Sequence, residues 1–241
     1  FREQVNGLTY QGVISINPEP SSFRGMNQKE SLQLSVFHEL GHVITEGNKD
    51  DIDCFKRFIY EDCEITQKLS SDGYSDFSKG FELLDEVVAQ NVAESLLYDR
   101  LGKERPNYVR YQSKTLNPNG TFLSNFVEYG EFQELAYQFA CCFDFIKEKE
   151  SMNSVLHQFS KEMFSSSFCK DMYDEIKDND EKRKDVIIML ICMGKIKDAK
   201  YSSFGLSQSS LDVSNYFDIF HTISSKYMDD ENSKVNMKVQ S

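Results

Sequence analysis

Val36-Phe37-His38-Glu39-Leu40-Gly41-His42-Val43-Ile44 is the stretch that decides how this chain folds and what chemistry it can carry. It contains the pattern His-Glu-x-x-His. Residues four apart on a helix project from the same side, one turn apart, so His38 and His42 would face the same way. Two imidazoles placed like this can bind one Zn²⁺ ion, and Glu39 between them can reach a water molecule on the metal.

The residues around this pattern predict a helix of about five turns. Asn27 is a favourable N-cap, Glu30 completes a capping box, and Gly47 is a natural stop. Glycine inside a helix costs about 1 kcal/mol relative to alanine, so Gly41 predicts that another element packs closely against the metal-binding face. Apolar residues at helical spacing predict a buried stripe, formed by Leu32, Val36, Phe37, Leu40, Val43 and Ile44.

Burial of this helix favours a metal site over the alternative, a chance occurrence of the pattern on a surface helix. Two histidines and a glutamate are costly to bury without a partner. A metal site with a fourth position open for water needs a third protein ligand. The remaining histidines, His157 and His221, lie far downstream on helices that look structural. A carboxylate is therefore the expected third ligand.

Glu86 is the favoured carboxylate. On a helix it shares its face with Ala89, Gln90 and Ala93, and small residues there would let the two helices approach. Gln90 could also hydrogen-bond a ligand histidine. The rival ligands are Glu131 and Glu134, which lie on a later predicted helix near Tyr129, and Glu94 is a weaker candidate.

The composition limits the class of partner. The net charge of −12 argues against nucleic-acid binding and against attraction to anionic membranes. The longest apolar run, residues 186–193, is too short to span a bilayer. The six cysteines show no zinc-knuckle spacing and favour reduced core thiols in a cytoplasmic protein, with disulfides as the alternative. Because the chain opens at Phe1 without an initiator methionine, secretion stays open as a second localisation.

Taken in order, the chain predicts a mainly helical α+β protein. Residues 8–17 read as one strand or a tight hairpin, which would serve either as a substrate-binding edge or as a small structural sheet. Residues 103–121 look like a long loop. Helices are expected at about 27–46, 50–69, 76–100, 122–147, 151–164, 168–178, 181–194 and 208–228, and the polar tail from Asp229 is expected to fray.

His38-Glu39-Leu40-Gly41-His42 followed by a helical glutamate resembles the gluzincin group of zinc metallopeptidases. The local pattern is most similar to the ImmA/IrrE family. Its second helix is matched here by Glu86, Ala89, Ala93, Leu96 and Leu97, whereas Asn91 is shifted by one position. The resemblance covers about residues 8–100. A ligand set with Glu131 or Glu134 would look more like the anthrax lethal factor group.

The resemblance implies a zincin-like catalytic core, which we place over 1–121. The pattern of the remaining sequence predicts a helical C-terminal part over 122–228 packed on this core and a flexible tail over 229–241. It implies that His38, His42 and Glu86 bind Zn²⁺ and that Glu39 activates the zinc-bound water. Tyr108, Tyr111 and Tyr129 are open candidates for stabilising the oxyanion.

The function implied is a zinc metalloendopeptidase acting on a protein or peptide. One alternative is a catalytically inactive binding or regulatory protein on the same scaffold. Another is a zinc hydrolase of a different bond, such as a deformylase, but those enzymes use a cysteine from an upstream strand and no cysteine precedes His38.

Overall fold

The computed structural model describes residues 7–10, 12–18, 26–47, 49–61, 72–103, 132–147, 151–202 and 213–238. This part of the chain is mainly helical with one small antiparallel sheet, as the sequence predicts. The strands are β1 (Gly7–Tyr10) and β2 (Val13–Ile16), and the helices are α1 (Gln28–Glu46), α2 (Lys49–Glu61), α4 (Asp72–Leu101), α5 (Gln133–Ala140), α6 (Met152–Met163), α7 (Phe168–Ile176), α8 (Asp180–Ser202) and α9 (Ser214–Lys238).

The start and end of α1 confirm the prediction from its capping residues. The side chain of Asn27 accepts the backbone N–H of Glu30 at 3.0 Å, and the Glu30 carboxylate accepts the N–H of Asn27 at 3.0 Å. Gly47 caps the C-terminal end. Both helix ends are thus satisfied by residues next to them in the sequence, which is why they could be predicted locally.

The segment predicted as a strand or hairpin is a hairpin. β1 and β2 pair antiparallel, with Tyr10 opposite Val13 and Leu8 opposite Ser15. Gly12 lies in the turn at a φ of 72°, a conformation that side-chain-bearing residues rarely adopt. Gly7, Thr9 and Ile14 are half-buried on one face of the hairpin, whereas Leu8, Tyr10 and Val13 are exposed on the other.

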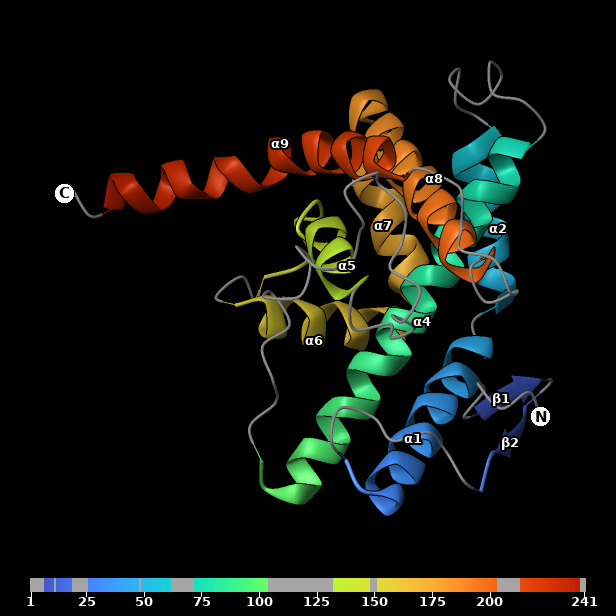
Figure 1. Cartoon of the computed structure of the whole chain (residues 1–241). Helices are drawn as coiled ribbons and strands as arrows, with labels where there is room; N and C mark the ends of the chain where they lie inside the picture. The colour runs from blue at the N-terminus through green and yellow to red at the C-terminus, as the bar shows by residue number, and fades with distance from the viewer. Residues whose placement is uncertain are drawn as a thin grey trace.

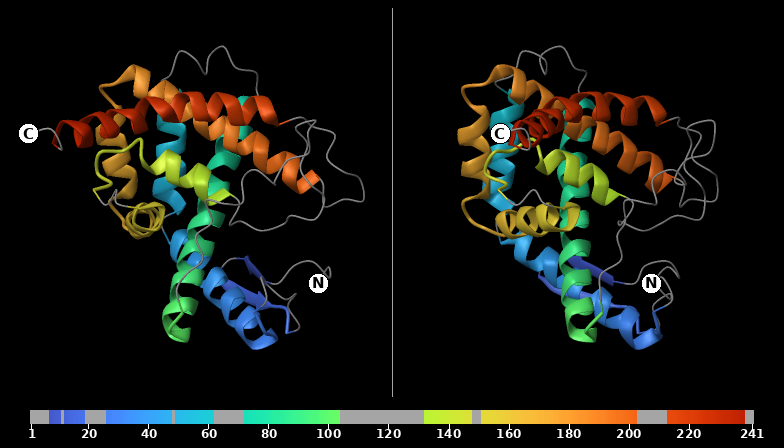
Figure 2. Two further views of the ribbon diagram at one scale, coloured as in Figure 1. Left: turned by 60° about the vertical axis from the view of Figure 1, so that its left-hand side comes forward. Right: turned by 90° about the vertical axis from the view of Figure 1, so that its left-hand side faces the viewer.

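Helix α4 is the central element of the fold (Figures 1 and 2). Its C-terminal half runs beside α1, and the hairpin lies along α1. Its N-terminal half crosses α8 inside the helical body. A Cβ atom on Gly80 would lie 2.1 Å from the carbonyl oxygen of Leu190, and one on Gly194 would lie 1.9 Å from that of Asp76. The two helices therefore meet backbone to backbone, with no room for side chains at either glycine.

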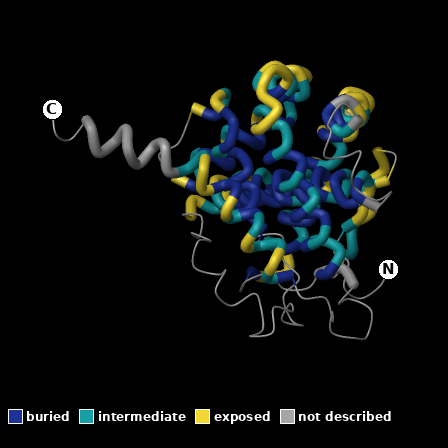
Figure 3. The backbone as a smooth tube through the Cα atoms, turned by 90° about the horizontal axis from the view of Figure 1, so that it is seen from above, coloured by how far each residue is buried: buried dark blue, intermediate teal, exposed yellow. Residues whose placement is uncertain are grey.

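The hydrophobic core lies where α4 crosses the C-terminal helices, and Figure 3 shows the buried residues gathered there. It is rich in phenylalanine, of which the chain has 19. Within the segment expected to be a helix over 122–147, Phe132, Leu135, Phe139 and Phe143 are all buried. A second, smaller cluster joins α1 to α4 through Met26, Leu34, Ala93 and Leu97.

The predicted buried stripe of α1 is wrong at two of its positions, and the other four are half-buried rather than buried. Leu40 is 43% exposed and Ile44 is 49% exposed. The hairpin and α4 instead cover the other sides of the helix, burying Ser31, Leu34, Ser35, Glu39, Gly41 and Thr45. Close packing at Gly41 and polar contacts at Glu39 determine which side is covered, and neither effect is visible in the spacing of apolar residues.

Several element limits also differ from the sequence-based expectation. The helix expected over 122–147 ends at Ala140, and two short turns follow at 141–142 and 144–145. Helix α4 already begins at Asp72 and α8 continues to Ser202. Helix α9 runs past Asp229 to Lys238, and the flexibility of the tail stays a prediction.

Other expectations are not tested. The predicted loop over 103–121 lies outside the described residues from 104 onward, as does the domain boundary near 121, which stays a prediction. Within the described ranges, no helix combines the length and the hydropathy needed to cross a bilayer.

Candidate metal centre

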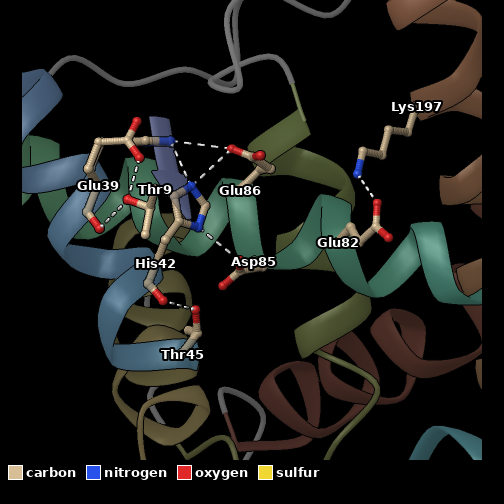
Figure 4. Close-up of polar contacts among 9 residues, drawn as sticks. Thr9, Glu39, His42, Thr45, Glu82, Asp85, Glu86 and Lys197 are labelled. Carbon is tan, nitrogen blue, oxygen red and sulfur yellow. Dashed lines mark hydrogen bonds and ion pairs between the residues drawn. The ribbon is translucent and has the colours of Figure 1, made fainter. Parts of the chain in front are cut away.

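Three side chains from α1 and α4 converge on one point. His38 and His42 lie one turn apart on α1, and their Nε2 atoms are 3.0 Å from each other. Glu86 comes from α4, and its Oε2 atom lies 3.3 Å from each of the two Nε2 atoms. Figure 4 shows the Glu86 carboxylate facing His42 across the gap between the two helices. These three residues could hold one metal ion.

The spacing of these donor atoms matches what a small tetrahedral ion requires. Zinc binds imidazole nitrogen and carboxylate oxygen at about 2.0–2.2 Å, so donors sharing one tetrahedral ion lie about 3.3 Å apart. The observed separations are 3.0, 3.3 and 3.3 Å. Glu86 Oε2 is also buried, and its partners at this point are the two imidazoles at 3.3 Å, neither of which makes a well-aligned hydrogen bond to it. The residues therefore fit the ion that the motif implies.

Asp85 is a site residue that the sequence analysis missed. Its Oδ2 atom lies 2.8 Å from Nδ1 of His42, so the imidazole N–H donates to the carboxylate (Figure 4). Burial by itself lowers the pKa of His42, but the contacts with Asp85 and Glu86 outweigh it and raise that pKa to about 10. Metal-binding histidines usually donate their second N–H to such an acceptor. An acidic residue beside the ligand candidate was the signal that could have revealed it.

Glu86 is held ionised by the same two histidines. Burial by itself raises the pKa of its carboxyl group, but the contacts with His38 and His42 dominate and lower the pKa well below its usual value. The carboxylate is therefore charged at neutral pH without a metal, its charge balanced by an imidazolium. A bound cation would take over this balancing role and displace the Nε2 proton of His42.

The approach of the two helices depends on small residues, as the sequence predicts. Gly41 faces Ala89, and a Cβ atom on Gly41 would lie 3.0 Å from both the Cα and the Cβ of Ala89. Ala89 is one turn after Asp85 on α4, and Gly41 immediately precedes His42. The contact therefore sets the separation of α1 and α4 at the level of the three candidate ligands.

Glu39 is held by the hairpin rather than by the histidines. The hydroxyl of Thr9 on β1 donates to Glu39 Oε2 at 2.6 Å and lies 3.2 Å from the backbone oxygen of Glu39 (Figure 4). Glu39 is 5% exposed, covered by the inner face of β1. The predicted base thus lies next to His38 in sequence and under the hairpin in space.

The other candidates from the sequence have different partners. Gln90 donates to Glu94 at 2.7 Å, so it does not show the expected bond to a ligand histidine. Glu134 accepts a bond from Gln138 on its own helix at 3.2 Å. Gln138 also bonds His221 at 2.8 Å, and His157 is exposed on α6. Glu131, Tyr108, Tyr111 and Tyr129 lie outside the described residues.

The chemistry of the centre is therefore inferred from its geometry. No protein-family model, curated protein or solved structure matches this chain. Two imidazoles and one carboxylate form a donor set that suits a divalent transition metal, and three protein ligands leave a further coordination position open.

Proposed function

We propose that this chain is a zinc-dependent metallopeptidase with a zincin-like fold, hydrolysing peptide bonds of a protein or peptide. The observation that carries the proposal is the convergence of His38, His42 and Glu86, with separations of 3.0, 3.3 and 3.3 Å, beside a glutamate on the same helix. This is the set of groups that Glu-assisted hydrolysis at zinc requires.

Zinc is the metal that suits these residues best. A site with two histidines, one glutamate and an open position is typical of catalytic zinc. When bound, the ion would supply a Lewis acid that acidifies water and polarises a carbonyl group. The resemblance to the gluzincins leads to the same assignment.

Each residue of the chain has a distinct role in this proposal. His38, His42 and Glu86 hold the ion. Asp85 keeps the Nδ1 proton on His42 and so directs the Nε2 lone pair toward the ion. Glu39 accepts the proton of the attacking water and passes it to the departing amine.

A second candidate is a metal-binding regulatory protein that does not hydrolyse its partner. The observation that favours it is the environment of Glu39, which is 5% exposed and hydrogen-bonded to Thr9. A base that exchanges protons with water must be reached by that water. The two candidates share the metal and differ only in whether Glu39 acts on a bound substrate.

The two candidates can be separated with purified protein, metal analysis and a peptide library. For the peptidase, the Glu39→Gln variant should keep its zinc and lose hydrolysis by about 100-fold or more. Glu46→Gln is the matched control, because it makes the same change two turns later on α1 and keeps an oxygen for the N–H of Gly12. Zinc binding without hydrolysis by the wild type would favour the regulatory protein. A chain that binds no zinc would exclude both.

A further inference from the structure

The inner face of β1 makes two contacts with the same glutamate. Thr9 donates a hydrogen bond of 2.6 Å to Oε2 of Glu39. Gly7, two residues earlier and so on the same face of the strand, lies against the rest of the carboxyl group. A Cβ atom there would be 2.5 Å from Oε1, 2.7 Å from Cγ and 2.9 Å from Cδ of Glu39. The backbone of β1 is thus shaped around this one side chain.

The hairpin is attached to α1 at a second point. The N–H of Gly12 in the turn donates to the carboxylate of Glu46 at 3.0 Å. Glu46 follows Glu39 by two helical turns and lies on the same side of α1. A two-stranded hairpin is only marginally stable by itself, so its contacts with α1 hold it in place. The hairpin in turn covers Glu39.

We propose that Thr9 is a positioning residue for Glu39, an inference that rests on the proposed peptidase function. A glutamate side chain has several rotatable bonds, and ordering it costs free energy that has to be offset before it can act as a base. Threonine is stiff at χ1, so its hydroxyl is aimed firmly. Its bond holds Oε2, and Gly7 provides the space in which the carboxyl group lies. The hydroxyl of Thr9 bonds to Glu39, so Thr9 acts through that residue.

The test compares Thr9→Val, which removes the hydroxyl and keeps the shape, with Thr9→Ser, which restores a hydroxyl. Ser15→Ala is the matched control, because it removes a hydroxyl from the exposed face of the same hairpin. In peptide hydrolysis by the zinc-loaded protein, Thr9→Val should lower kcat about 10- to 100-fold with KM unchanged. Thr9→Ser should recover most of the loss, and Ser15→Ala should match the wild type.

A second measurement does not depend on turnover. Co²⁺ bound at the centre has a visible absorption spectrum that is sensitive to the ligand in its open coordination position and to the groups that hydrogen-bond to that ligand. Thr9→Val should change this spectrum in the same direction as Glu39→Gln does, while Co²⁺ affinity stays within about threefold of the wild type. Gly7→Ala, which forces the carboxyl group to move, should shift the spectrum too. It also serves as the second variant if Thr9→Val does not fold.

The outcomes separate this proposal from the proposed function. An active wild type whose Thr9→Val variant has the same kcat and the same Co²⁺ spectrum would overturn the role of Thr9 and leave the peptidase in place. A wild type that binds metal and hydrolyses no peptide would overturn both. Equal losses in Thr9→Val and Thr9→Ser would also exclude the proposal, because packing of the hairpin and not the hydroxyl would then be responsible.

Discussion

Gly41 of α1 and Ala89 of α4 are in contact, and a Cβ atom on Gly41 would lie 3.0 Å from both the Cα and the Cβ of Ala89. The contact lies beside the candidate metal ligands of both helices. Its closeness explains why a residue with poor helix propensity occupies the middle of the helix that carries His38 and His42. The geometry of the centre therefore depends on two residues that are not themselves candidate metal ligands.

A methyl group at this contact is expected to weaken metal binding. In Gly41→Ala, the gain in helix propensity of about 1 kcal/mol is opposed by overpacking that costs about 1–3 kcal/mol. The helices should separate and zinc affinity should fall on the order of tenfold. Adding Ala89→Gly to the Gly41→Ala variant makes room for the new methyl group and should restore zinc affinity. Competition with a chelator measures this affinity. Full affinity in Gly41→Ala alone would show that the helices tolerate the methyl group.

The identity of the third ligand can be tested with two matched glutamates. Glu86→Ala should remove zinc from the protein or weaken its binding greatly, because two imidazoles alone hold the ion poorly. Glu134→Ala and Glu131→Ala should keep a full equivalent of zinc, measured by elemental analysis after gel filtration. Loss of zinc in either of the latter variants would move the site to the later glutamates.

Asp85 is expected to matter for metal affinity without touching the metal. Asp85→Asn keeps the shape of the side chain but removes the charge that holds the N–H of His42, so affinity should fall about 10- to 100-fold. Glu82→Gln is the control, since Glu82 lies nearby on α4 and pairs with Lys197 of α8 instead. If both variants bind zinc as the wild type does, the bond of 2.8 Å between Asp85 and His42 does not support the centre.

Zinc binding should release a proton and strengthen as the pH rises. The pKa of His42 is raised to about 10 in the metal-free protein, so its imidazole is charged at neutral pH and must lose a proton to bind the ion. Affinity is therefore expected to increase between pH 6 and pH 8. Calorimetric titrations in buffers of different ionisation enthalpy measure the number of protons released. A heat of zinc binding that is the same in every buffer would mean that no proton is released, and would contradict the raised pKa of His42.

The cysteines should differ strongly in reactivity. Burial raises the pKa of Cys192 to about 12 and that of Cys142 still further, whereas Cys54 is exposed on α2. The thiolate is the reactive form, so an alkylating reagent at pH 8 should label Cys54 and leave Cys142 and Cys192 unlabelled until urea unfolds the chain. Peptide mapping by mass spectrometry identifies the labelled positions, and Cys54→Ser removes the fast reaction at that position. Fast labelling of Cys192 in the folded protein would contradict its burial.

The sequence predicted helix ends and turns well where these are fixed by interactions between neighbouring residues. The capping box of Asn27 and Glu30 and the stop at Gly47 involve neighbouring residues, and both are found as predicted. The hairpin over residues 8–17 is likewise formed by residues close in sequence. The buried side of α1 was predicted wrongly at Leu40 and Ile44, which have the right spacing for a core stripe but are left exposed by the described elements.

The sequence by itself determined which turn of which helix presents two imidazoles on one side, since that depends only on helical periodicity and on caps close to the turn. It also narrowed the third ligand to a few carboxylates. Only the tertiary structure decided that Asp85 and Glu86 face the histidines, because His42 and Asp85 are 43 residues apart and meet through the packing of α1 on α4. The same holds for Thr9 and Glu39, 30 residues apart, which are joined where the hairpin lies on α1.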